Sequence, residues 1–462
     1  MQELLAPVQT YAEALRTRVL VFDGAMGTSI QRFNLSAADF GGKVGCNDFL
    51  VLSKPDVVED IHCSFLEAGA DVLETCTFQA TSRRLAEWEL GERAYELNFQ
   101  AARLARQAAG RFGQRFVAGS MGPTGMLPSS ADQALSAITF GELRELFREQ
   151  AEALLAGGVD LLLIETAQDM LELKAGLFGI RDALANAGRS VPVQAQVTLD
   201  VTGRMLLGTD VSGALATLEA LPCDVIGLNC STGPEHMREP IRYLCQHSTK
   251  PVSCIPNAGL PVNDGSGEAM YLLGPEPMAA ELQAFVAEFG VNVIGGCCGT
   301  TPDHIRAFVA ATAGLTPTRS VSEAEPRLAS AVRAVSLWQE PRPLIIGERV
   351  NAQGSRKVKE LLLADDYESV VQIARSQADE GAHALDVCCA LTERTDEATQ
   401  MRELVRRLAA AVEVPLVIDS TEVDVMQIAL ENYPGRPIVN SIHLGEADRL
   451  HKVLPLVRDH GA

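Results

Sequence analysis

The sequence predicts an α/β protein with three parts: a (β/α)8 TIM barrel, a linker, and a second, truncated (half) barrel of the same type. Three observations predict this architecture. Short apolar runs alternate with longer amphipathic segments eight times between about residues 19 and 313. A segment richer in proline, serine and threonine follows at 314–340. The alternation then restarts and runs through four more units to residue 462.

The eight apolar runs of the first region have the length and composition of buried strands. They are VLVFDGAMG (19–27), DVLETCT (71–77), FVAGSMGP (116–123), DLLLIETA (160–167), VQAQVTLD (193–200), DVIGLNCS (224–231), VSCIPNAG (252–259) and VNVIGGCC (291–298). Amphipathic spacing between them, as at 142–158 and 278–289, predicts helices. An open doubly wound sheet is the weaker alternative, because it usually has fewer strands and one glycine-rich phosphate turn.

Three segments divide the chain: a first domain over 1–313, a linker over 314–340 and a second domain over 341–462. Within the linker, RLASAVRAV (327–335) suggests a short helix. The second domain contains four further strand patterns: PLIIGERVN (343–351), ALDVCC (384–389), PLVIDST (415–421) and PIVNSI (437–442). Four units make half of a barrel and leave strand edges unpaired, so we expect the second domain to be truncated from a longer protein.

Composition excludes several classes of protein. The formal net charge is −21, with 60 acidic and 39 basic residues, which argues against a nucleic-acid partner. No apolar run approaches the roughly 18 residues of a membrane-spanning helix, and the first residues lack a signal-peptide pattern. We therefore expect a cytoplasmic protein with no membrane partner. Eleven cysteines, an odd number over a long chain, do not resemble a disulfide framework.

Three cysteines lie at predicted strand ends, where TIM barrels build their active sites. Cys230 ends the sixth strand, and Cys297 and Cys298 end the eighth between glycines. Strands six and eight are near neighbours around a barrel, so three thiolates can converge on one metal. Three sulfur ligands with one open position are typical of catalytic zinc. The alternative is that the cysteines pack as small apolar side chains. Cys388 and Cys389 lack the glycine setting and a third cysteine, so we expect neither to bind metal.

Several motifs resemble known families. Four segments resemble the homocysteine S-methyltransferase family: DGAMGT (23–28), GSMGPTG (119–125), GLNCSTGP (227–234) and GGCCGTTPDHI (295–305). The second domain is similar to pterin-binding domains in IGERVNAQGSRK (346–357), LDV (385–387), VIDS (417–420) and IVNSI (438–442). This order of domains resembles the cobalamin-dependent methionine synthases. Cys76, Gln79 and Cys388 depart from the pattern, because these families commonly show asparagine there.

The resemblance implies a set of site residues. It implies zinc on Cys230, Cys297 and Cys298, with no catalytic side chain beyond the zinc-bound substrate thiolate. It implies that the amino-acid end of homocysteine is held by Asp23, Gly24, Ala25, Met26, Gly27, Glu165 and Asn257. For a pterin in the second domain it implies Glu348, Asn351, Asp386, Asp419 and Asn440.

The resemblance also implies an activity, that of a methyltransferase. Homocysteine thiolate would take a methyl group from methylcobalamin to give methionine, and 5-methyltetrahydrofolate would recharge the cobalamin. The implied partner is a cobalamin-binding domain of a longer protein. A homocysteine methyltransferase that uses betaine or an S-methyl amino acid is the alternative enzyme. A non-catalytic zinc-binding barrel is the alternative of another class. A fusion with a folate reductase would need a flavin-binding barrel, which the second domain does not resemble.

Overall fold

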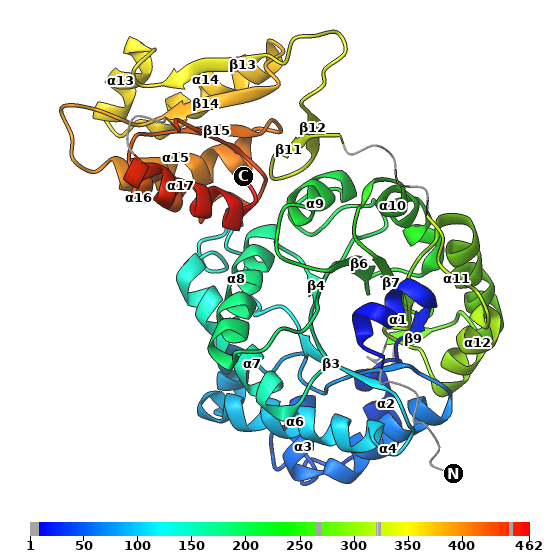
Figure 1. Cartoon of the computed structure of the whole chain (residues 1–462). Helices are drawn as coiled ribbons and strands as arrows, with labels where there is room; N and C mark the ends of the chain where they lie inside the picture. The colour runs from blue at the N-terminus through cyan, green and yellow to red at the C-terminus, as the bar shows by residue number, and fades with distance from the viewer. Residues whose placement is uncertain (1–8, 264–268, 320, 322–324, 443–446) are drawn as a thin grey trace.

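The computed structural model describes residues 9–263, 269–319, 321, 325–442 and 447–462. Eight parallel strands form its larger sheet, in the order β1-β10-β7-β6-β5-β4-β3-β2. Phe22, next to β1, also bridges Val72 of β2, so the sheet closes into the predicted barrel (Figure 1). All eight predicted strands are confirmed: β1 (Leu20–Val21), β2 (Val72–Glu74), β3 (Phe116–Met121), β4 (Leu161–Ala167), β5 (Val193–Val197), β6 (Val225–Asn229), β7 (Val252–Ile255) and β10 (Val293–Ile294).

Helices surround the barrel in a ring (Figure 1). The helices predicted at 142–158 and 278–289 are observed as α7 (Phe140–Gly157) and α11 (Pro275–Phe289). The others are α2 (Met26–Ile30), α3 (Leu50–Ser53), α4 (Pro55–Glu67), α5 (Ser82–Leu85), α6 (Ala94–Ala109), α8 (Met170–Ala187), α9 (Val211–Leu218), α10 (Pro234–His247) and α12 (Pro302–Thr312). Within the described ranges, no helix combines the length and the apolar character that crossing a membrane requires.

The barrel interior is filled by side chains and closed at one end by α1 (Tyr11–Thr17). Tyr11 packs edge-on against Phe116, with ring centroids 5.5 Å apart. Its hydroxyl donates to Oε1 of Gln194 at 2.9 Å, and the Gln194 amide donates to Ser253 Oγ at 3.2 Å. Tyr11, Gln194 and Ser253 are therefore paired with one another inside the barrel, as burial favours.

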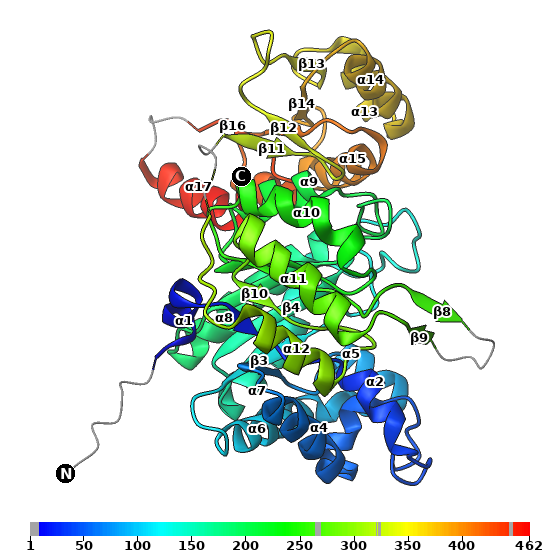
Figure 2. The ribbon, with the colours of Figure 1, turned by 90° about the vertical axis from the view of Figure 1, so that its right-hand side faces the viewer.

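A short hairpin between β7 and α11 was not expected from the sequence. It pairs β8 (Pro261–Asn263) with β9 (Ala269–Tyr271) in antiparallel register. Figure 2 shows the hairpin projecting from the barrel beyond the ring of helices. Three-residue strands are too short to produce a recognisable pattern of alternation.

The prediction of a helix at 327–335 is wrong. The segment forms an antiparallel hairpin of β11 (Arg327–Ala329) and β12 (Ala334–Ser336). Ala329 also exchanges two backbone hydrogen bonds with Arg436, at 3.0 and 2.9 Å. Pairing with a segment about 100 residues away thus overrides the local helical pattern, as tertiary contacts commonly do.

The second sheet has four parallel strands in chain order, as predicted. They are β13 (Ile346–Asn351), β14 (Ala384–Cys388), β15 (Leu416–Asp419) and β16 (Ile438–Asn440). The accompanying helices are α13 (Arg356–Leu363), α14 (Tyr367–Asp379), α15 (Glu397–Ala411), α16 (Val423–Leu430) and α17 (Ala447–His460). Crossover helices between parallel strands bury the apolar core of this sheet.

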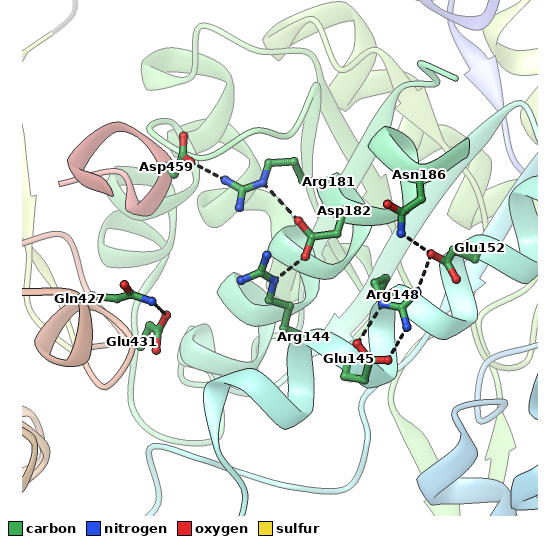
Figure 3. A network of polar contacts seen from close by, with 10 residues as sticks. All are labelled: Arg144, Glu145, Arg148, Glu152, Arg181, Asp182, Asn186, Gln427, Glu431 and Asp459. Carbon is green, nitrogen blue, oxygen red and sulfur yellow. Dashed lines mark hydrogen bonds and ion pairs between the residues drawn. The ribbon is translucent and has the colours of Figure 1, made fainter. Parts of the chain in front are cut away.

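The second sheet and the barrel meet at the outer face of α8. The fully buried Lys174 donates to the carbonyls of Tyr433 and Gly435 at 2.9 and 3.2 Å. At the end of α17, the His460 ring lies against Phe178, with centroids 4.6 Å apart. Figure 3 shows the polar edge of this contact, where Arg181 of α8 reaches Asp459 of α17 at 2.7 Å.

Burial lowers the pKa of Lys174 to about 7 from its usual 10.5, which predicts a pH-dependent interface. At pH values between these two pKa values, Lys174 binds more protons in the unfolded state than in the folded state. Its contribution to the free energy of unfolding therefore rises with pH. From pH 7 to pH 9, the free energy of unfolding of the wild type should rise by about 2 kcal/mol relative to Lys174→Met. Urea unfolding at the two pH values measures this difference. The exposed Lys357→Met is the control, and an equal pH dependence in all three proteins would contradict the assignment.

Candidate active site

The three predicted cysteines converge at the carboxyl ends of β6 and β10. Sγ of Cys230 lies 3.9 Å from Sγ of Cys298, and all three sulfurs, including that of Cys297, lie within 4.8 Å of one another. A tetrahedral zinc ion with bonds of about 2.3 Å requires sulfurs about 3.8 Å apart. The thiols therefore fit three corners of a tetrahedral metal site.

The loop that carries Cys297 and Cys298 is held by a hydrogen bond from its backbone to a neighbouring side chain. The Cys298 N–H donates to Oδ1 of Asn257 at 3.0 Å. At Gly296, a Cβ atom would lie 2.5 Å from the Thr300 side chain, so this turn requires glycine. Asn257 is buried and is not among the residues that line the cavity. Its amide oxygen holds the backbone of the cysteine loop.

The three thiols influence one another strongly. Hydrogen bonds from Cys230 and Cys297 lower the pKa of Cys298 to about 3, whereas those to Cys230 and Cys298 raise the pKa of Cys297. One thiolate therefore forms easily, and it disfavours the next because like charges repel. A divalent cation removes this conflict, since it stabilises all three thiolates together.

A cavity of about 460 Å³ extends from the cysteines toward β1 and β2. Its lining includes most residues expected to contact homocysteine, namely Asp23, Gly24, Ala25, Met26, Gly27 and Glu165. Cys76 and Gln79, which depart from the family pattern, also lie on its wall. Residues 24–27 lead from β1 into α2, and Gly24 is packed tightly, because a Cβ there would lie 2.6 Å from the Phe65 ring.

Four carboxyl groups line the cavity: those of Asp23, Asp48 and Glu165, which are buried, and that of Glu74, which is partly buried. Both carboxyl oxygens of Asp23 accept from the Glu74 N–H, at 3.2 and 3.1 Å. Burial raises the pKa of Asp23 and Glu74 well above their usual values, and raises that of Glu165 to about 7. Burial disfavours the charged form of each acid, so a cationic ligand that pairs with them is favoured here.

Glu165 is oriented by two neighbours. Ser120 donates to one of its oxygens, and the Asn229 amide donates to the other at 3.2 Å. The same Asn229 amide contacts Thr166 Oγ1 at 2.8 Å, and its Oδ1 accepts from the Thr166 N–H at 2.7 Å. Thr166 has φ of 56°, so these bonds hold a backbone conformation that side-chain-bearing residues rarely adopt.

The residues expected to bind a pterin only partly cluster. Asn351 donates to Asp386 and Asp419 at 2.6 and 3.0 Å, and Asn440 pairs with Asp419 in the strand register. Glu348 is exposed, three residues earlier on β13. Burial raises the pKa of both aspartates. Asn351 is therefore central to this group.

Sequence reasoning missed three residues of the first site. Glu74 and Ser120 lie in predicted strands, at or near their carboxyl ends, so the rule that singled out Glu165 also identifies them. Tyr271 enters the cavity from the β8–β9 hairpin, which no sequence pattern predicts.

The chain matches known proteins in both of its parts. The model of the pterin-binding enzymes matches residues 347–462. The methionine synthases of Mycobacterium tuberculosis and Mycobacterium leprae are each 43% identical over 97% of this chain. The chain spans 38% of the length of these relatives. Among solved structures, the metallated homocysteine methyltransferase MmuM from Escherichia coli is similar over 65% of this chain and 98% of its own, at 26% identity and a TM-score of 0.52.

The barrel accounts for the larger of the two family matches. The model of the homocysteine S-methyltransferases covers residues 20–312, the span that contains all eight barrel strands, the cysteine cluster and the buried carboxyl groups. On this match, which exceeds half of its length, the chain belongs to the homocysteine S-methyltransferase family.

Proposed function

We propose that this chain is the part of a methionine synthase that binds homocysteine and prepares its thiol for methylation. The observation that carries the proposal is the cavity itself, with three convergent thiols at one end and buried carboxyl groups nearby. The identity to methionine synthases extends over both the barrel and the second sheet, which supports this function over that of a lone homocysteine methyltransferase.

The thiol cluster is proposed to hold zinc through Cys230, Cys297 and Cys298. Thiolates are soft ligands that select zinc over hard ions such as magnesium. A free thiol of pKa about 8.5 is only a few per cent thiolate at neutral pH. Zinc bound there would act as a Lewis acid that keeps the homocysteine sulfur ionised. The three cysteines would hold the metal at the end of the cavity that they line.

The amino-acid end of homocysteine is proposed to lie against β1 and β4. Glu165 would pair with the ammonium group, since Ser120 and Asn229 already orient its two oxygens. Asp23 lies in the same cavity, and a cationic partner there would favour its ionised form. Backbone N–H groups of the loop 24–27 would hold the substrate carboxylate. Binding in this orientation points the substrate sulfur toward the cysteines.

The methyl donor is proposed to be methylcobalamin, presented by a cobalamin-binding domain of the longer protein. The second sheet would hold 5-methyltetrahydrofolate through Asn351, Asp386 and Asp419, with Glu348 and Asn440 nearby. Betaine or an S-methyl amino acid is less well supported as donor, because neither needs a pterin-binding segment. Formation of methionine would exclude a barrel that only stores zinc.

The metal assignment predicts that Cys298→Ser loses both zinc and activity. The wild type should bind about one zinc per chain and form methionine from homocysteine and free methylcobalamin. Removing one of three thiolates should weaken zinc binding by at least about tenfold. Elemental analysis after dialysis against a chelator measures the zinc. Cys389→Ser, at a buried position in the second sheet, is the control. Full zinc in Cys298→Ser would refute the assignment.

The substrate orientation predicts a binding defect in Glu165→Gln. Loss of a buried charged hydrogen bond of about 1.5–3 kcal/mol should weaken homocysteine binding roughly 10- to 150-fold. Zinc content should not change, because Glu165 is not a ligand. Calorimetry with homocysteine tests this expectation. The exposed Glu276→Gln is the matched control, and equal affinities in the two variants would show that the ammonium group lies elsewhere.

The geometry of the second sheet predicts weak folate binding by this chain alone. A pterin needs a concave site that buries most of its surface. The described part of the second sheet offers four strand ends and no opposite wall. Calorimetry should therefore detect weak or no binding of 5-methyltetrahydrofolate, while homocysteine still binds the barrel. Micromolar affinity for the folate would contradict this expectation.

A further inference from the structure

The β8–β9 hairpin brings a tyrosine to the thiol cluster. Tyr271, the last residue of β9, lines the same cavity as the three cysteines. Its hydroxyl makes a hydrogen bond with the Cys298 side chain. Neither the mechanism nor the sequence motifs described above account for this contact.

The base of the hairpin is fastened to the cysteine loop by a chain of hydrogen bonds. The Leu273 N–H donates to the Ala258 carbonyl at 3.0 Å, and the Ala258 N–H donates to the Cys298 carbonyl at 2.9 Å. Nε2 of His304 lies 2.9 Å from the Leu273 carbonyl. Tyr271 is only two residues from this anchor, so its ring is positioned by the same loop that positions Cys298.

The tyrosine also approaches the backbone closely. At Gly299, directly after Cys298, a Cβ atom would lie 2.3 Å from Cβ of Tyr271. Gly299 has φ of +82°, which also favours glycine. The cysteine loop therefore leaves room for the aromatic ring beside the ligand. An incidental surface contact would not require this close fit.

We propose that Tyr271 is a positioning residue of the metal centre, whose hydroxyl donates a hydrogen bond to the Cys298 thiolate. The inference rests on the proposed zinc function of the cysteines. A hydrogen bond to a ligating sulfur withdraws electron density from it, so that the sulfur donates less to the metal. The metal then remains more acidic toward the fourth ligand, which is the homocysteine sulfur.

The test compares Tyr271→Phe, which keeps the ring, with the wild type and with the control Tyr95→Phe. Tyr95 is exposed on α6. Zinc-free protein is loaded with Co²⁺, whose thiolate charge-transfer absorption reports the electron density on the sulfurs. In Tyr271→Phe, this absorption should move to longer wavelength, because the sulfur lone pairs lose their hydrogen bond. Homocysteine binding to the zinc-loaded variant should weaken by about tenfold.

Three outcomes would overturn the inference. If the absorption of Tyr271→Phe matches that of Tyr95→Phe, the hydroxyl does not act on the sulfur. If Tyr271→Phe binds no Co²⁺ at all, the tyrosine is needed to hold the ion and does not merely tune it. If the wild type itself shows no thiolate charge transfer, the proposed metal function fails first, and the inference fails with it.

Discussion

The site depends on the hydrogen bonds that close the barrel around β1. The Phe22 N–H donates to Ile294 at 2.8 Å on one side, and the Asp23 N–H donates to Val72 at 2.9 Å on the other. The short strand β1 and the residues that follow it thus join β10, the last strand of the barrel, to β2. Because all strands run parallel, this closure brings Asp23, the carboxyl end of β2 and the cysteine loop to one face. An open sheet would leave β1 and β2 as unpaired edges and the cavity without one wall.

Within that cavity, both kinds of functional group favour positive charge. The thiols at one end cannot all ionise together without a cation. The acids near β1 and β4 are buried, and burial raises their pKa values until a partner compensates their charge. Homocysteine carries an ammonium group at one end and a thiol, a ligand for zinc, at the other. On the proposed function, the electrostatics of the cavity therefore help to fix the direction in which the substrate binds.

The second sheet is attached to the side of the barrel through α8, and several of the contacts involve backbone groups. Lys174 bonds two carbonyls, and Ala329 pairs with Arg436 through the main chain. Such contacts depend on the path of the backbone more than on side-chain identity, so they specify orientation. The β8–β9 hairpin projects from another side of the barrel and is not covered by the second sheet (Figure 2).

The sequence by itself determined the parallel strands and singled out the three cysteines that converge. Strand and helix periods are local, so all twelve parallel strands were predictable, and glycines beside Cys297 and Cys298 separated them from Cys388 and Cys389. Only the tertiary structure decided the rest. Asn257 is a strand-end residue like Glu165, yet its side chain accepts a hydrogen bond from the Cys298 backbone, whereas Glu165 lines the cavity. Three further features depend on contacts between segments that are far apart in the sequence or too short to show a pattern. They are the β11–β12 hairpin, the burial of Lys174 and the contact of Tyr271 with Cys298. Such contacts exist only once the barrel has closed, and no local pattern encodes them.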